Sequence, residues 1–223
     1  AGEIVGLTGL VGAGRTEIAR LIFGADRLDS GEIVLDGESV SVRSPRDAIR
    51  SGICLLTEDR KGQGLVLGQT VQENFGLPNL GAFSSGFLIS SSRESDAFEG
   101  YVERMRIKIS GHAQPAGTLS GGNQQKVVLA KWLQRNADVI IFDEPTRGID
   151  VGAKFEIYQL IHGLAEQGKA ILMISSELPE ILGMSDRIIV MNEGRVTGEI
   201  EDCSAATQES VMKLATHREE VAA

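Results

Sequence analysis

Two adjacent carboxylates at the end of an apolar run are the residues best suited to chemistry. Asp143 and Glu144 directly follow Val139–Phe142, a short run of β-branched and aromatic residues. This composition predicts a strand buried on both faces, and such strands present functional groups at their carboxyl ends. A carboxylate there can hold a cation through oxygen or act on water as a general base.

A glycine-rich turn near the start of the chain could bind a phosphate. Residues Gly9–Thr16 read GLVGAGRT and follow a strand-like run. They match the phosphate-binding pattern G-x-x-x-x-G-K-[ST], except that Arg15 stands in place of lysine. Such a loop offers backbone N–H groups and the positive end of a helix dipole to a phosphate. Thr16 would then offer its hydroxyl to Mg²⁺, and Asp143 would hold the waters bound to that metal.

A second glycine-bearing loop precedes the carboxylates. Ser120-Gly121-Gly122 comes just before a helix that the sequence predicts over Gln124–Arg135, so this loop can also present N–H groups to a phosphate. An ordinary loop, helix and strand would explain the stretch taken alone. The turn at residues 9–16 favours the functional interpretation.

Composition argues against several classes of protein. The 223 residues suffice for one large or two small domains. Of these residues 42% are hydrophobic, but no apolar run is long enough to span a bilayer, which is typical of a soluble globular protein. A net charge of −9 argues against a general nucleic-acid binder. Cys54 and Cys203 lie far apart and lack ligand spacing, which argues against zinc and disulfides and points to the cytosol. The chain begins directly with a strand, which suggests a cut fragment.

The remaining pattern predicts an α/β fold with an inserted helical region. Asp36-Gly37 lies between two alternating runs and predicts a hairpin, and Ser44-Pro45 begins a short helix that Gly52 ends. From about residue 62 to 117 strand signals fade, and a helix over about 94–106 is the clearest element. Strands and helices then alternate again, with helices near 153–166 and 179–182 and strands at 170–175, 187–191 and 195–200.

Together these motifs resemble those of the ATP-binding domain of an ABC transporter. Gly9–Thr16 occupies the Walker A position, Leu119–Asn123 resembles the LSGGQ signature, Val139–Asp143 the Walker B strand and Gly148–Asp150 the D-loop. The stretches GLVGAGRTE, TEDRK, LSGGNQQK, DEPTRGIDVGAK and SSELPEILGMSDRI are similar to the second ATP-binding half of the tandem subunits of bacterial monosaccharide importers of the ribose, galactose and xylose type.

The resemblance implies a fold, cofactors and a site. The fold is the P-loop NTPase fold of ABC ATPases, with a mainly parallel sheet, a β-rich flank and a helical subdomain at residues 66–136, inserted in a 1–223 domain whose N-terminal strand is truncated. The cofactors are ATP and Mg²⁺. The ATP-binding residues would be Gly9, Gly12, Ala13, Gly14, Arg15 and Thr16, with Thr16 and Asp143 at the metal. The signature residues offered to a partner's ATP would be Leu119, Ser120, Gly121, Gly122, Asn123 and Gln124, and the D-loop residues Gly148, Ile149 and Asp150.

Three residues depart from the pattern of an active ATPase. Arg15 keeps the charge of the lysine, but its longer, planar fork does not fit a point-charge site without rearrangement. Ser176 aligns with the switch histidine and cannot present an imidazole donor to the γ-phosphate. Glu58 replaces the Q-loop glutamine, so an anion stands where an amide would help to hold Mg²⁺ and water. Glu144 remains as a general base, and Glu144, Ser176 and Glu58 are the candidate catalytic residues of a site that looks degenerate.

The resemblance also implies partners and a location. In such importers one polypeptide carries both ATP-binding halves, which act at the cytoplasmic face of the inner membrane on permease subunits fed by a periplasmic sugar-binding protein. This chain would be the C-terminal half, peripheral to the membrane, soluble by itself and weak or inactive as an ATPase alone, with no nucleic-acid partner.

Two alternatives to this interpretation stay open. One is a non-hydrolysing, regulatory nucleotide-binding module, which Arg15, Glu58 and Ser176 favour. The other is a soluble ABC-type ATPase of DNA repair or translation, for which the region 62–117 is short and weakly basic.

Overall fold

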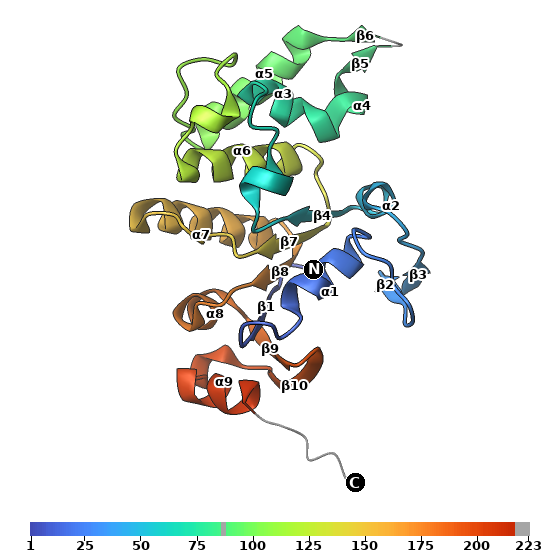
Figure 1. Cartoon of the computed structure of the whole chain (residues 1–223), viewed down its shortest axis with the longest axis vertical. Coiled ribbons are helices and arrows are strands. Elements are labelled where there is room, and N and C mark those ends of the chain that lie inside the picture. Colours follow the sequence, from blue (N-terminus) through green and yellow to red (C-terminus); the bar gives the residue numbers. More distant parts are fainter. Residues whose placement is uncertain (86–87, 217–223) are drawn as a thin grey trace. The chain divides into compact units, whose positions relative to one another are not determined.

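The computed structural model describes residues 1–85 and 88–216, which form two compact units (Figure 1). The core unit consists of Ala1–Leu55, Asp138–Pro145 and the described part of Glu156–Ala223, and the arm unit consists of the described part of Leu56–Ala137 together with Thr146–Phe155. The subdomain expected at residues 66–136 falls within the first segment of the arm unit, and its limits stay a prediction. In the described part of the chain, no helix combines the length and the apolar character needed to cross a membrane.

The core unit is built on a six-stranded sheet with the strand order β10-β9-β1-β8-β7-β4. Strand β1 pairs in parallel with β8 and β9, and β7 pairs in parallel with β8, whereas β10 runs antiparallel to β9. This is the mainly parallel α/β sheet that the sequence predicts. The bounds are β1 Ile4–Gly9, β4 Ile53–Leu56, β7 Val139–Asp143, β8 Ala170–Ile174, β9 Arg187–Asn192 and β10 Arg195–Ile200.

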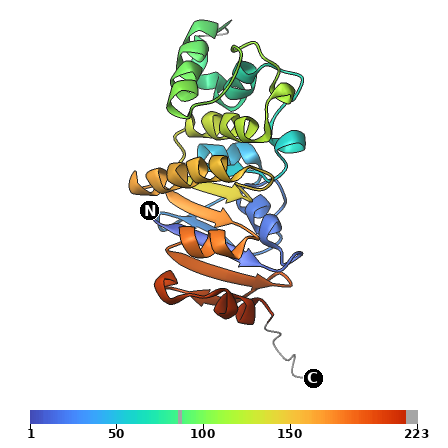
Figure 2. The ribbon, with the colours of Figure 1, turned by 90° about the vertical axis from the view of Figure 1, so that its left-hand side faces the viewer.

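Helices cover both faces of this sheet. Figures 1 and 2 show α8, α9 and the later part of α7 on one face and α1 on the other. Strands β1, β4, β7, β8 and β9 are mostly apolar and largely buried, as parallel strands covered on both sides must be, whereas the antiparallel edge strand β10 is more exposed. The helices are α1 Arg15–Ile22, α2 Pro45–Arg50, α7 Val151–Glu166, α8 Leu178–Met184 and α9 Gln208–Ala215, with a 3₁₀ turn at Cys203–Ala205.

The predicted hairpin and short helix of the core unit are confirmed. Strands β2 (Ile33–Leu35) and β3 (Glu38–Val40) pair antiparallel around Asp36 and Gly37, whose φ angles are 52° and 83°. A two-residue hairpin turn of type I′ requires positive φ angles at both central residues. Asp and Gly adopt such angles more readily than most residues, which is why Asp-Gly predicts this turn. The side chain of Ser44 caps α2 by accepting a hydrogen bond from the Asp47 N–H, and Pro45 opens the helix.

The arm unit is mainly helical. Its helices α3, α5 and α6 pack together around the fully buried Phe75 and Phe98, whose ring centroids are 5.1 Å apart. Aromatic pairs at this spacing stabilise a small core beyond their buried area. The elements are α3 Val71–Gly76, α4 Leu80–Phe83, α5 Ser91–Arg104, α6 Gly121–Leu133, a two-residue strand pair β5 Ser84–Ser85 and β6 Leu88–Ile89, a π-helical turn Arg60–Gly64, and 3₁₀ turns at Leu77–Asn79 and Ala116–Thr118.

The sequence interpretation needs two corrections. Gly121 and Gly122 are not in a loop but open helix α6, which starts before Gln124 because the side chain of Ser120 caps it. Helix α9 was not predicted, although Thr207 and Ser210 form a reciprocal cap before a helix that buries Val211. That cap is a signal the sequence carries.

Candidate functional site

The glycine-rich turn connects β1 to α1 in the core unit. Position 9 has no room for a side chain, because a Cβ on Gly9 would lie 2.2 Å from the carbonyl oxygen of Met191. Gly14 is the N-cap of α1 with φ 94° in the left-handed region, which favours glycine. Hydrogen bonds of 3.0 Å from the Ala13 N–H to the Leu10 carbonyl and from the Gly194 N–H to the Ala13 carbonyl hold the turn. The turn therefore has a fixed backbone before any ligand is bound.

The start of α1 suits an anion. Within the described part of the chain no side chain caps this helix, so the backbone N–H groups of its first turn are left for a ligand or for solvent. Arg15 is the first helical residue, and its buried Nη1 has no hydrogen-bond partner among the described residues. A helix N-terminus with a guanidinium beside it attracts phosphate through both the dipole and the charge.

Thr16 and Asp143 bring two oxygen donors together. The Thr16 hydroxyl donates to Oδ1 of Asp143 over 3.3 Å, and Asp143 is the last residue of the buried strand β7. A hydroxyl and a carboxylate are oxygen ligands of the kind Mg²⁺ prefers, together with waters and phosphate oxygens. The donor set therefore fits the metal that the sequence predicts at these residues.

Glu144 contacts two of the residues that depart from the ATPase pattern. Its Oε2 accepts a 3.1 Å hydrogen bond from the Ser176 hydroxyl, and its Oε1 lies 3.6 Å from Nη1 of Arg15. The backbone of Glu144 is left-handed, with φ 50°, and its N–H donates to the Ile174 carbonyl over 2.9 Å. A non-glycine residue in this conformation is strained and persists only where its surroundings hold it.

The segment that presents Ser176 is held by buried polar contacts that sequence reasoning missed. The hydroxyl of Ser175 donates to the carboxylate of Glu180 and accepts from the Glu177 N–H, and the Thr8 hydroxyl donates to the Ser175 carbonyl over 3.0 Å. Because Ser175 and Glu180 are both buried, these contacts fix the end of β8 just before Ser176. A carboxylate five residues after a serine in SSELPE was the available signal.

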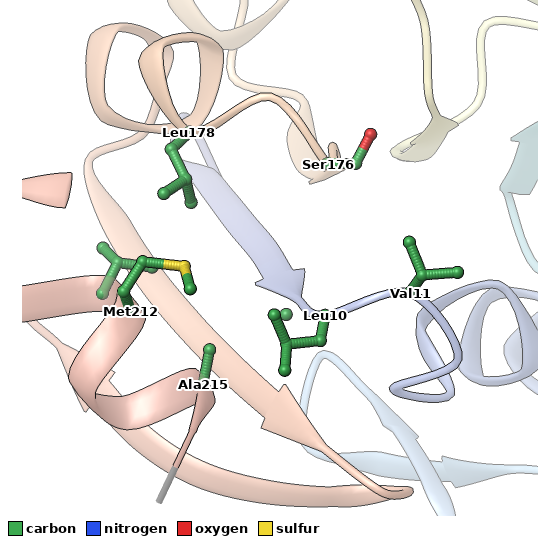
Figure 3. A pocket seen from close by; sticks show the side chains of 8 residues that line it. Leu10, Val11, Ser176, Leu178, Met212 and Ala215 are labelled. Carbon is green, nitrogen blue, oxygen red and sulfur yellow. The ribbon is translucent and has the colours of Figure 1, made fainter. Parts of the chain in front are cut away.

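An apolar hollow of about 200 Å³ lies beside the glycine-rich turn (Figure 3). It is bordered by the turn, the start of α8 and one face of α9, and Ser176 lies at its edge. The residues that line it are Gly9, Leu10, Val11, Ser176, Leu178, Val211, Met212 and Ala215. Its walls are mostly aliphatic, so it offers no charged group to a ligand.

The signature residues lie in the arm unit. Ser120 is exposed, and its Oγ accepts from the N–H and Nδ2 of Asn123, 3.4 and 3.0 Å away. Asn123 is fixed in turn, because its Oδ1 accepts from the Lys108 N–H over 2.8 Å. Leu119 and Gln124 are buried, and Gln124 Nε2 donates to the Ala116 carbonyl. The first turn of α6 is thus a preformed helix start with an exposed hydroxyl.

The D-loop residues and Glu58 also belong to the arm unit. Asp150 caps the start of α7 by accepting from the Ala153 N–H over 3.0 Å, and Gly148 has φ 68°. The Glu58 carboxylate pairs with Arg147, a partner that sequence reasoning missed. An arginine next to the D-loop in PTRGID was the signal. The part of Glu58 in hydrolysis stays a prediction.

Comparison with known proteins identifies the family. The model of the family described as "ABC transporter" matches residues 1–147. The chain belongs to the ABC transporter family. Solved ABC cassettes share its fold: the dimeric structure of a bacterial ABC transporter cassette has a TM-score of 0.75 and 26% identity, and covers 89% of this chain and 85% of its own. A post-hydrolysis cassette bound to ADP and Pi also has a TM-score of 0.75, with 24% identity over 89% of this chain and 85% of its own.

Curated relatives are similar over nearly all of this chain. The chain is 57% identical over 219 residues to "Putative ribose/galactose/methyl galactoside import ATP-binding protein 1" of Burkholderia lata, which covers 98% of this chain. It is 54% identical over 216 residues to "Ribose import ATP-binding protein RbsA" of Bacillus subtilis, which covers 97% of it. The chain spans only 43% and 44% of the length of these two relatives.

Proposed function

We propose that this chain is one ATP-binding half of a tandem subunit that drives a monosaccharide importer of the ribose/galactose type. The support is the ABC family match, together with relatives that are named as sugar import ATP-binding proteins and are more than twice as long. In this proposal the other half of the subunit and membrane permeases are direct partners, and a periplasmic sugar-binding protein is an indirect one. The chain acts at the cytoplasmic face of the membrane.

We further propose that its own P-loop site hydrolyses ATP slowly. The single observation that carries this is that Glu144, the only general base expected there, lies against Arg15 and Ser176. The arginine attracts the carboxylate and so draws it away from the water that it would activate. Residue 176 offers a hydroxyl, where an imidazole would support the developing charge. Each lost donor of that kind costs about 10²- to 10³-fold in rate, although such losses need not multiply.

The residues of this site still suit binding of ATP with Mg²⁺. The turn Gly9–Thr16 and the uncapped start of α1 would hold the phosphates, and Thr16 and Asp143 would hold the metal, which neutralises phosphate charge. Binding can therefore persist where hydrolysis is slow. ATP held at this site would contribute to closing the two halves rather than to turnover.

The signature residues are the part of this chain that we expect to act in hydrolysis. Ser120 is exposed at the start of the 13-residue helix α6, whose dipole and first-turn N–H groups favour an anion. We propose that they complete the ATP site of the other half, where charge develops on the γ-phosphate. Each half would thus supply a different part of the one fast site.

Two variants of the full-length subunit, assayed in the reconstituted transporter, test this division of labour. Ser120→Arg places a large cation at the helix start and should abolish transport-coupled hydrolysis, whereas Glu144→Gln should reduce it only severalfold. Ser92→Arg is the matched control, because it adds the same side chain to an exposed position of helix α5 in the same unit. If Glu144→Gln proved as damaging as Ser120→Arg, the local site would not be degenerate.

The runner-up is a purely regulatory nucleotide-binding module, which the contacts of Arg15, Glu144 and Ser176 also favour. Under that alternative neither variant changes the maximal rate of hydrolysis, and Ser120→Arg changes only its dependence on regulators. The same assay therefore separates the two functions.

A further inference from the structure

Arg60 joins three segments of the arm unit. It begins the π-helical turn Arg60–Gly64, and its Nη1 donates to the carbonyl of Gly121 over 3.4 Å. Its Nη2 lies 3.6 Å from the position that a Cβ on Gly148 would take. A Cβ on Gly121 would in turn lie 3.5 Å from the carbonyl oxygen of Gly148. The guanidinium therefore lies where the start of α6 meets the turn before α7.

Among the residues that the structure describes, no group of opposite charge pairs with Arg60. Within residues 1–85 and 88–216 the Gly121 carbonyl is its polar contact, and no carboxylate lies within ion-pair distance. Partial burial lowers the pKa of the guanidinium, although arginine stays charged at neutral pH. The positive charge lies beside the start of helix α6, where the dipole is also positive. An arrangement that is electrostatically unfavourable by itself becomes favourable when an anion is bound there.

The turn that carries Arg60 is held at several points. The Asp59 side chain accepts from the Gly62 N–H over 2.9 Å, and Lys131 of α6 donates to the Gly64 carbonyl. The neighbouring segments are also tied by the ion pair of Glu58 with Arg147. Two arginines, Arg60 and Arg147, thus connect residues 58–60 with the turn at 147–148. The guanidinium of Arg60 is presented from a fixed backbone.

We propose that Arg60 is a positioning residue for the signature turn. It holds the Gly121 carbonyl, and through it the first turn of α6, at a fixed place relative to Gly148. Its charge adds to the helix dipole in stabilising the negative charge that develops on the γ-phosphate of ATP bound by the partner half. The inference rests on the proposed function, because that function assigns the signature residues to the other half's ATP. It assigns to the arginine of the TEDRK stretch a role outside the four motifs.

The test uses Arg60→Gln, Arg60→Lys and the control Lys61→Gln in the full-length subunit. Lys61 is exposed in the same turn. Lys61→Gln therefore removes one positive charge, as Arg60→Gln does, but leaves the contact of Arg60 with Gly121 in place. Displacing a reacting group by about 1 Å costs up to about 10²-fold in rate. We therefore expect Arg60→Gln to lower kcat of the reconstituted transporter at least tenfold, with a much smaller change in KM for ATP. Arg60→Lys should recover part of this loss, since it keeps the charge but not the planar fork.

Hydrogen exchange of the same subunits provides a readout independent of hydrolysis. Arg60→Gln should speed exchange in peptides that cover residues 119–125 and 146–150, and leave helix α5 (Ser91–Arg104) unchanged. A kcat within twofold of the unmodified subunit, an equal loss in Lys61→Gln, or faster exchange throughout α5 would each overturn the proposal. If Ser120→Arg leaves hydrolysis intact while Arg60→Gln still speeds exchange at 119–125, the positioning contact stands and the proposed function fails.

Discussion

Burial of a lysine in the arm unit predicts how stability changes with pH. Lys131 lies on α6 with 8% of its surface exposed; its Nζ donates to the Gly64 carbonyl and lies 5.5 Å from the ring centroid of Trp132. Burial lowers the pKa of this ammonium from 10.5 to about 8. The folded protein therefore loses this proton at a lower pH than the unfolded chain does.

The size and sign of the effect follow from this difference in pKa. Below pH 8 both states carry the proton, and the folded state bears the full cost of the buried charge. Between pH 8 and 10.5 the unfolded chain binds more protons, so the free energy of unfolding rises with pH. At about 1.4 kcal/mol for each pKa unit, the total rise is on the order of 3 kcal/mol.

Urea unfolding of the unmodified protein and of Lys131→Met, from pH 7.5 to 10.5, measures this contribution. Trp132 is the only tryptophan in the sequence and adjoins the site, so its fluorescence reports the local transition. The difference in unfolding free energy between the two proteins should change by about 3 kcal/mol across this range, because methionine removes the titrating group. The exposed Lys61→Met variant should show no such change. A difference that stays constant with pH would refute the assignment of a buried charge at Lys131.

Two further predictions concern the core unit. Burial raises the pKa of the Cys54 thiol to about 12, whereas Cys203 is only partly buried. Iodoacetamide at pH 8 should therefore modify Cys203 first and Cys54 only on unfolding. Rapid labelling that persists in Cys203→Ser would contradict this prediction. Gly12→Ala should lower the free energy of unfolding by about 1–2 kcal/mol, because residue 12 has a left-handed backbone. Gly9→Ala should lower it more, because its Cβ would also clash with the Met191 carbonyl. Thermal unfolding of both variants measures the two losses, and equal losses would show that the turn adapts to a side chain at position 9.

The parts of the fold that depend on local chemistry could be predicted from the sequence. Asp36-Gly37 specified its hairpin through the φ angles of a two-residue turn, and Ser44-Pro45 specified the start of α2. The apolar run before Asp143 specified a buried strand, because few other elements bury so short a run on both faces. Each of these signals lies within a few residues of the element that it specifies.

The contacts that the sequence did not reveal are long-range. Arg60 meets Gly121, which is 61 positions away, and Arg147 meets Glu58, which is 89 positions away. Lys131 lies within the helix that the sequence predicts at Gln124–Arg135, but the Gly64 carbonyl that accepts its hydrogen bond is 67 positions away. Spacing along the chain predicts which side chains share a helix face, but not which distant backbone carbonyl accepts their hydrogen bonds.

The location of ADP after hydrolysis tests the central claim most directly. The full-length subunit in its reconstituted transporter is allowed one turnover with a photoreactive ATP analogue, trapped with vanadate, irradiated and digested, and the labelled peptides are assigned to one half or the other. Our account predicts that trapped ADP labels the other half and scarcely labels the half that contains Gly9–Thr16. Equal labelling of both halves would contradict it, since the site of Arg15, Glu144 and Ser176 would then turn over as fast as its partner.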